Sequence, residues 1–158
     1  MENFSAAIIL VSPQGDANIG QVARAMKNFD QKDLRLVNPC SHLTDEAYKW
    51  AVSACDLLEN AKIFTNLPDA IADISTSVAF TRRLGHSRRK HLDLKKSSEW
   101  MTKKASIGKL AFVFGREDSG LTNEEVNLCD ATITIHTSPT FSSLNLSQAV
   151  LIACQELF

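Results

Sequence analysis

The sequence predicts an α/β fold in which helices flank a mainly parallel sheet. Short, continuous apolar runs recur along the chain, and such runs are typical of strands buried on both faces. Segments with helical apolar periodicity separate these runs, as they do in α/β proteins. The length of 158 residues is that of one domain with one core. We therefore expect a single domain over residues 1–158.

The expected strands end where turn residues or glycine follow an apolar run. The run 6–11 stops at a Ser-Pro-Gln-Gly-Asp cluster, and the run 110–114 stops at Gly115. The other strand patterns are shorter or less apolar. In chain order, the expected strands are 6–11, 34–37, 62–65, 77–81, 110–114 and 131–135.

Helices are expected between these strands. Asn18 stands at an N-cap position before an apolar stripe, and Thr122 with Glu125 forms a capping box. Arg24 lies about 140° around the first helix from Ile19, so it points away from the stripe. In chain order, the expected helices are 19–29, 45–54, 69–73, 95–104, 122–129 and 146–158.

Four loops follow strand ends, where α/β sheets bind their ligands: 12–18, 82–93, 115–121 and 136–145. Gly115 permits close backbone approach to a ligand, and five hydroxyl side chains with Asn145 crowd the start of the last helix. One helix cap needs only one such residue, so the surplus favours a binding loop. Taken singly, each of these features also has an ordinary structural explanation: Arg24 as an exposed arginine, the segment after Gly115 as a turn, and the residues around Asn145 as a helix cap. The phosphate-loop and dinucleotide-binding glycine patterns are both absent.

Charge is distributed unevenly along the chain. Residues 82–104 hold nine Lys or Arg against Asp93 and Glu99, a net charge of +7. The other residues hold eight Lys or Arg against sixteen acids, which gives −8 there and −1 overall. The balanced total disfavours non-specific coating of nucleic acid. The basic segment favours local phosphate binding, with a solvated loop as the alternative.

Composition also excludes several classes of protein. No apolar run approaches the ~18 residues of a membrane span, and no secretion signal precedes the first strand. The cysteines Cys40, Cys55, Cys129 and Cys154 are widely spaced and have no histidine pair near them. This pattern favours reduced thiols in a cytoplasmic protein over disulfides or a metal site.

Three segments carry a family resemblance. They are Asn18-x-Gly20-x-x-x-Arg24, then Phe114-Gly115-Arg116-Glu117-x-x-Gly120-Leu121, then Ser142-Ser143-Leu144-Asn145-Leu146-Ser147-x-Ala149-Val150. In this order they resemble the three motifs of the SpoU/TrmH class of the SPOUT superfamily of RNA methyltransferases. The second and third are most similar to the TrmJ branch, whose members 2′-O-methylate nucleotide 32 (C or U) in the tRNA anticodon loop.

The resemblance implies a SPOUT-type fold with a C-terminal trefoil knot that binds S-adenosylmethionine. It also implies a homodimer, tRNA as substrate, a cytoplasmic location and no metal. The implied cofactor-binding residues are Ala79, Phe80, Thr81, Gly115, Ile135, Ser142, Ser143 and Leu144.

The implied reaction is attack of a ribose 2′-hydroxyl on the sulfonium methyl group. The implied catalytic residues are Arg24, Asn18, Glu117, Ser143 and Asn145. Because arginine stays protonated at neutral pH, we expect Arg24 to hold a phosphate and stabilise the developing alkoxide rather than act as a base. Glu117 is expected to orient Arg24, while Ser143 and Asn145 place the ribose or the cofactor carboxylate.

The basic segment then has an expected partner. The expected RNA-binding residues are Arg82, Arg83, Arg88, Arg89, Lys90 and Arg116. The last helix is apolar nearly all round, which favours a dimer interface, with burial inside the same chain as the alternative. The TrmJ branch usually continues into a C-terminal helical extension, so we expect this sequence to be the catalytic domain.

Two other functions stay open at this point. One is a SpoU-type methyltransferase that acts on another tRNA or rRNA nucleotide. The other is a non-catalytic RNA-binding paralogue, against which the presence of Asn18, Arg24, Glu117 and Asn145 argues.

Overall fold

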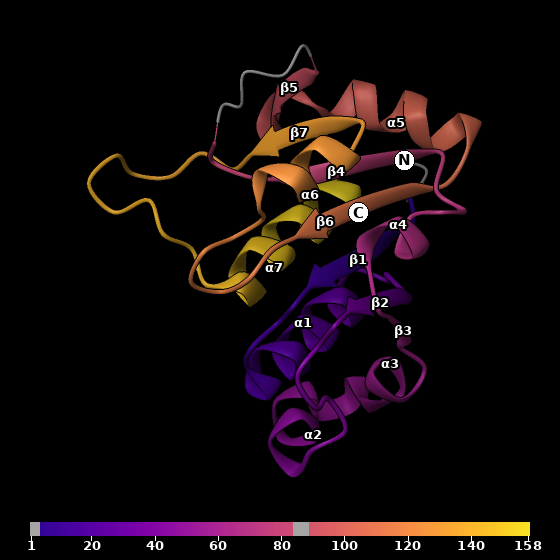
Figure 1. The fold of residues 1–158 in the computed structure, drawn as a ribbon, viewed down its shortest axis with the longest axis vertical. Coiled ribbons are helices and arrows are strands. Elements are labelled where there is room, and N and C mark those ends of the chain that lie inside the picture. The colour runs from indigo at the N-terminus through magenta and orange to yellow at the C-terminus, as the bar shows by residue number, and fades with distance from the viewer. Residues whose placement is uncertain (1–3, 84–88) are drawn as a thin grey trace.

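The computed structural model of this protein describes residues 4–83 and 89–158. Its strands run side by side in one sheet of seven, in the order β3-β2-β1-β6-β4-β7-β5 (Figure 1). Every neighbouring pair is parallel, which confirms the predicted fold class. The strands are β1 (Ala6–Val11), β2 (Asp33–Val37), β3 (Lys62–Phe64), β4 (Thr76–Phe80), β5 (Lys90–Asp93), β6 (Leu110–Phe114) and β7 (Ala131–Thr134).

Helices cover both faces of this sheet. The described helices are α1 (Asp16–Asn28), α2 (Asp45–Ala51), η1 (Val52–Ala54), α3 (Cys55–Glu59), α4 (Leu67–Ala70), η2 (Leu94–Lys96), α5 (Ser98–Ile107), α6 (Asn123–Leu128) and α7 (Leu146–Leu157). Ile8 and Leu10 of β1 pack in a core with α1, α2 and α7, whereas Ile9 and Val11 pack in a second core with α4 and α6. Burial on both faces explains the unbroken apolar runs of the central strands.

Two local predictions are wrong. The first helix begins at Asp16 with Gly15 as its N-cap residue, so Asn18 is not the cap. The carboxylate of Glu117 accepts hydrogen bonds from the backbone N–H groups of Gln14 and Gly15, the two residues before the helix, and the Asp16 carboxylate accepts from the backbone N–H of Ala17. The predicted loop 82–93 also contains strand β5, whose Lys-His-Leu-Asp sequence lacks the apolar pattern because it lies at the sheet edge.

The carboxyl ends of β1, β4, β6 and β7 meet at one edge of the sheet. Each of the four predicted ligand-binding loops begins there, because parallel strands all end on the same side. The apolar helix α7 packs against α1 of the same chain. Within the described ranges, no helix has the length and hydropathy needed to cross a lipid bilayer.

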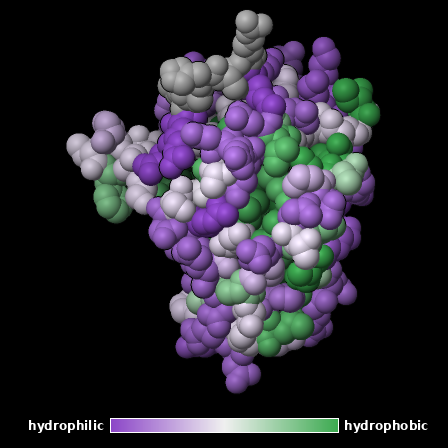
Figure 2. Space-filling model, viewed as in Figure 1, coloured by the Kyte–Doolittle hydropathy of each residue, from purple (hydrophilic) through white to green (hydrophobic). Residues whose placement is uncertain are grey.

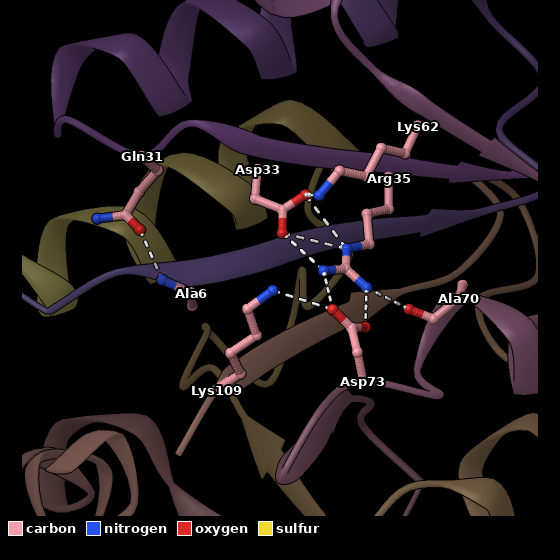
Figure 3. Close-up of polar contacts among 8 residues, drawn as sticks. All are labelled: Ala6, Gln31, Asp33, Arg35, Lys62, Ala70, Asp73 and Lys109. Carbon is pink, nitrogen blue, oxygen red and sulfur yellow. Dashed lines mark hydrogen bonds and ion pairs between the residues drawn. The ribbon is translucent and has the colours of Figure 1, made fainter. Parts of the chain in front are cut away.

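An ion-pair network around the buried Arg35 joins strands at the opposite edge of the sheet (Figure 3). The side chain of Arg35, only 2% exposed, donates to both carboxylate oxygens of Asp33, to Asp73 and to the carbonyl of Ala70. Lys62 and Lys109 pair with Asp33 and Asp73 at 3.2 and 2.9 Å. The network links the beginnings of β2 and β3 to the residues that precede β4 and β6.

The same network holds two carboxyl groups in their charged form. Hydrogen bonds from Arg35 and Lys109 hold the pKa of Asp73 well below its usual range. Burial alone would raise the pKa of Asp33, but hydrogen bonds from Arg35 and Lys62 lower it. A carboxyl group whose pKa falls on folding stabilises the fold above its unfolded pKa, and this stabilisation is lost as the pH falls through the folded pKa.

We therefore expect the free energy of unfolding to fall as the pH drops below about 4. The variant Asp73→Asn should lose about 1 kcal/mol of stability at pH 7, because Arg35 and Lys109 lose a charged acceptor, and less at pH 3. Urea unfolding at both pH values measures this difference. Asp30→Asn, in an exposed pair with Lys32, is the control and should lose little at either pH. An equal loss at pH 7 and pH 3 for Asp73→Asn would contradict this assignment.

Candidate functional site

A cavity of about 400 Å³ opens at the carboxyl edge of the sheet. Its walls come from the ends of β4, β6 and β7, from the loops that follow them, and from the first turn of α7. The volume lies within the usual range for small-molecule sites, and apolar and polar groups share the walls. The lining residues that carry the argument below are Phe80, Thr81, Gly115, Glu117, Ile135 and Ser143.

The loop after β6 folds tightly over one side of this cavity. Arg116 and Gly120 form a backbone bridge, and Gly120 has a φ of 69°, a left-handed conformation that glycine adopts without strain. A Cβ atom on Gly115 would lie 2.1 Å from the carbonyl carbon of Gly120. Only glycine at position 115 therefore lets the two sides of the loop close.

Arg116 is part of the support of this loop. Its guanidinium donates a forked pair of hydrogen bonds to Glu125, at 2.9 and 3.1 Å, and a third to the carbonyl of Gly120. Burial would raise the pKa of Glu125, but the bonds from Arg116 and from the Thr122 backbone lower it. The predicted capping box of Thr122 and Glu125 is confirmed. The Glu125 side chain therefore both caps the start of α6 and accepts hydrogen bonds from Arg116.

Glu117 joins the loop after β6 to the start of α1. Its carboxylate accepts from the Gln14 and Gly15 backbone at 2.9 and 3.0 Å and from Asn18 Nδ2 at 3.3 Å. Asn18 in turn accepts from Asn145 Nδ2 at 3.2 Å. The start of α1 thus meets two segments that lie 99 and 127 residues further along the chain, through one line of polar contacts.

Asn145 extends the line into α7. As the N-cap residue of α7, it accepts from the backbone N–H of Ser147 at 2.9 Å. The Ser147 hydroxyl lies 2.9 Å from Gln21 Oε1, so α7 is tied to α1 a second time. Gly20, on the neighbouring turn of α1, lets α2 approach closely, because a Cβ there would lie 2.3 Å from the Ala47 carbonyl oxygen.

The mouth of the cavity is crossed by a contact between two loops. Arg82, which follows β4, donates to the hydroxyl of Ser142, which follows β7. The loop between β7 and α7 projects from the body of the molecule (Figure 1), and on it Phe141 is 79% exposed. Beyond the mouth, His136 pairs with Asp93 at 2.6 Å and links the ends of β7 and β5.

The predicted cofactor residues lie where a single ligand could touch them. All of them except Ala79 line the cavity; Ala79 is buried within β4. Of the predicted catalytic residues, Glu117 and Ser143 line the cavity, and Asn18 and Asn145 are hydrogen-bonded to the Glu117 side.

Arg24 does not join this group within one chain. It is exposed on α1, does not line the cavity, and makes no hydrogen bond or ion pair with residues 4–83 and 89–158. The acceptor expected to orient it, Glu117, instead holds Asn18 and the α1 start.

The predicted RNA-binding residues fall into three groups. Arg82, Arg83 and Arg116 line the cavity, whereas Lys90 begins β5 and Arg89 directly precedes it, and neither lines the cavity. Arg88 lies outside the described residues. The sequence reasoning gave no site role to Gln21 or Ser147, which tie α1 to α7. Ser147 is a residue of the third motif, and Gln21 lies one helical turn from Asn18 and Arg24 of the first, which are the only signals for them.

Comparison with protein families matches residues 5–155 to the SpoU rRNA Methylase family. The chain is similar to a tRNA (cytidine-2′-O-)-methyltransferase, TrmJ of Methanocaldococcus jannaschii, with 37% identity across 96% of this chain and 66% of that protein. It is also similar to LasT of Escherichia coli, described as an uncharacterized tRNA/rRNA methyltransferase, with 40% identity across 95% of this chain and 66% of that protein. The chain thus spans just under two thirds of the length of these relatives.

A solved structure is similar over the same extent. The crystal structure of TrmJ from Z. mobilis ZM4 superposes with a TM-score of 0.88 at 36% sequence identity. The match covers 96% of this chain and 68% of that one. The similarity therefore extends over almost the whole of this chain.

The Glu117 contacts predict a measurable effect on stability. Glu117→Gln replaces a carboxylate that faces three N–H donors by an amide with one accepting oxygen, so the free energy of unfolding should fall by about 1–2 kcal/mol. Asp118→Asn, a neighbouring exposed carboxylate, is the matched control and should change it by less than about 0.5 kcal/mol. Urea unfolding of both variants checks this, and equal effects would contradict the linking role of Glu117.

Proposed function

Because the chain belongs to the SpoU rRNA Methylase family, we propose that it transfers a methyl group from S-adenosylmethionine to a ribose 2′-hydroxyl of tRNA. The main support for this proposal is the cavity, because residues of all three family motifs meet at its rim. The similarity to a tRNA (cytidine-2′-O-)-methyltransferase supports tRNA as the substrate. The resemblance to the TrmJ branch favours nucleotide 32 of the anticodon loop, with cytidine or uridine as the base.

The cavity fits the cofactor in size and chemistry. Phe80, Phe114, Ile133 and Ile135 offer apolar surface to an adenine ring. Gly115 lines the cavity and lets the loop after β6 fold closely beside it, and the hydroxyls of Ser142 and Ser143 offer polar contacts. When bound, S-adenosylmethionine supplies a methyl group made electrophilic by its sulfonium centre.

The role of this chain is to place and activate the attacking hydroxyl. A ribose hydroxyl is a weak nucleophile that becomes reactive as its proton leaves and negative charge develops on oxygen. The guanidinium of Arg24, which stays charged at neutral pH, stabilises that charge and holds an adjacent phosphate by a forked contact. Ser143 and Asn145 hold the ribose, and Glu117 keeps Asn18 and Asn145 in position.

A homodimer explains how Arg24 reaches the reaction. The arginine lies outside the cavity of its own chain, so a second copy would bring it to the rim. Most apolar residues of α7 are buried against α1, but Leu151 and Phe158 stay 38% and 55% exposed and are available for that second copy. The terminal part of α7 is thus the favoured centre of the interface.

We also infer that the C-terminal part of the chain is knotted and that the protein is cytoplasmic. The strand order supports a knot, because β7 lies between β4 and β5 although it follows both in the chain. Four free cysteines support a reducing compartment such as the cytoplasm. RNA would enter past Arg82 and Arg83 at the mouth, with Arg89 and Lys90 along β5 beyond them.

A second candidate is methylation of another tRNA or rRNA nucleotide, which the similarity to LasT favours. Methyl transfer from labelled cofactor to unmodified tRNA and rRNA, followed by mapping of the modified nucleotide, separates the two. Transfer to neither RNA would support the non-catalytic RNA-binding paralogue instead.

Arg24→Ala should lower the rate of methyl transfer by about 100-fold or more while cofactor affinity stays unchanged. The reason is that the guanidinium stabilises negative charge that develops on the ribose oxygen only during the reaction. Lys27→Ala, on the same helix and paired with Asp56, is the matched control and should keep the rate. Single-turnover transfer to tRNA measures both variants. Wild-type rates in Arg24→Ala would overturn the proposed mechanism.

Gly115→Ala should abolish cofactor binding, because the added methyl group would force the Gly120 side of the loop outward. Calorimetry with S-adenosylmethionine measures binding, and circular dichroism shows whether the variant is folded. Ser53→Ala, at an exposed residue of η1 that does not line the cavity, is the control and should bind as the wild type does. Absence of binding heat with folded wild-type protein would contradict the family's cofactor for this chain.

A further inference from the structure

Five lysines, of which only Lys90 has a role in the proposed function, gather on one surface of the molecule. Lys90 comes from β5, Lys95 and Lys96 from η2, and Lys103 and Lys104 from α5. None of the five forms an ion pair with a carboxylate within residues 4–83 and 89–158. By contrast, four of the five lysines on the rest of the described chain, Lys27, Lys32, Lys62 and Lys109, each pair with an aspartate, and the fifth, Lys49, lies over Trp50.

An aromatic side chain lies at the centre of these lysines. The ammonium groups of Lys90 and Lys104 each lie 5.8 Å from the centre of the Trp100 ring. Two positive charges from different elements therefore meet at one half-buried ring without an acid between them. The attraction of the ring offsets part of their mutual repulsion, and a bound anion would offset the remainder.

The surface begins at the cavity side of the sheet and leads away from it. Element η2 follows the carboxyl end of β5, where Asp93 contacts His136 beside the cavity mouth. Helix α5 then runs back toward the beginning of β6, at the upper edge of Figure 1, where Figure 2 shows largely hydrophilic side chains. From Lys96 to Lys104 this surface extends about 12 Å, enough for several phosphates of one strand.

We propose that Lys90, Lys95, Lys96, Trp100, Lys103 and Lys104 bind the phosphate backbone of the RNA substrate outside the nucleotide that enters the cavity. Unpaired lysines suit a regular row of phosphates better than an acidic protein surface, because they contact phosphates without a fixed geometry. This surface extends the proposed function: it binds the helical body of the RNA, whereas the cavity binds one nucleotide. The inference therefore rests on RNA being the substrate.

The test compares two triple variants with equal loss of charge. Lys95→Gln/Lys96→Gln/Lys103→Gln removes exposed lysines of this surface, and Lys32→Gln/Lys49→Gln/Lys62→Gln removes exposed lysines elsewhere. We expect the first variant to bind unmodified tRNA roughly 10- to 100-fold more weakly, with a slope of log affinity against log salt that is smaller by about 2. Its KM for tRNA should rise while kcat and cofactor affinity stay unchanged, and the second variant should behave as the wild type.

Trp100 provides an independent optical measurement, because the chain has only two tryptophans. In Trp50→Phe, Trp100 is the single tryptophan, and tRNA should quench its fluorescence. In Trp100→Phe, the remaining Trp50 lies beside Lys49 on α2, a matched cation–aromatic pair 5.7 Å apart, and tRNA should leave its fluorescence unchanged. Equal quenching of both tryptophans would overturn the proposal.

The outcomes separate this proposal from the function on which it rests. If the wild type methylates tRNA but the first triple variant binds it as well as the second does, this surface is not an RNA site and the proposed function stands. If the wild type neither binds nor methylates RNA, both fail. If the first variant instead changes the oligomeric state in sedimentation velocity, the lysines serve a protein contact and the proposal is wrong.

Discussion

The candidate site depends on one carboxylate. Glu117 follows β6, yet it accepts hydrogen bonds at the start of α1, and Asn18 passes the connection on to Asn145 at the start of α7. These three segments are joined to one another here by side-chain hydrogen bonds, which set their spacing. This line of polar contacts gives three flexible segments a common geometry and leaves a cavity between them.

How accurately the sequence predicted each strand depends on how deeply that strand is buried. The central strands β1 and β6 were predicted to the residue, since strands covered on both faces must be apolar throughout. The edge strand β5 was missed, because one exposed side lets it keep lysine, histidine and aspartate. Asn18 was misassigned as a cap, since the helix begins two residues earlier, at Asp16, and the Asn18 side chain instead donates to Glu117, a partner 99 residues away that no local pattern can reveal.

The site was predicted less evenly. The motifs identified most of the cavity wall correctly, because loops at strand ends converge in any parallel sheet. They did not reveal that the guanidinium of Arg116 is already engaged by Glu125, or that Arg24 stands apart from the cavity of its own chain. Charge counting found the basic segment. It did not show that the segment divides into two parts, the arginines Arg82 and Arg83 at the cavity mouth and a separate lysine surface on β5, η2 and α5. That distinction depends on where β5 lies in the sheet.

The position of β7 has a consequence for the order of folding. It occupies the gap between β4 and β5, two strands that are made earlier in synthesis, and its pairing with them spans about 40 to 50 residues. Such non-local pairings form late, because the chain must lose the entropy of closing a long loop before any contact stabilises the pairing. Ile133, Ile135, Ser142 and Ser143 all belong to this last segment, so a nascent chain can complete the outer half of its sheet, from β1 to β3, before it has any ligand pocket. Competence to bind a ligand therefore arises in the final step of folding, and a chain that has this pocket has already assembled the rest of its sheet.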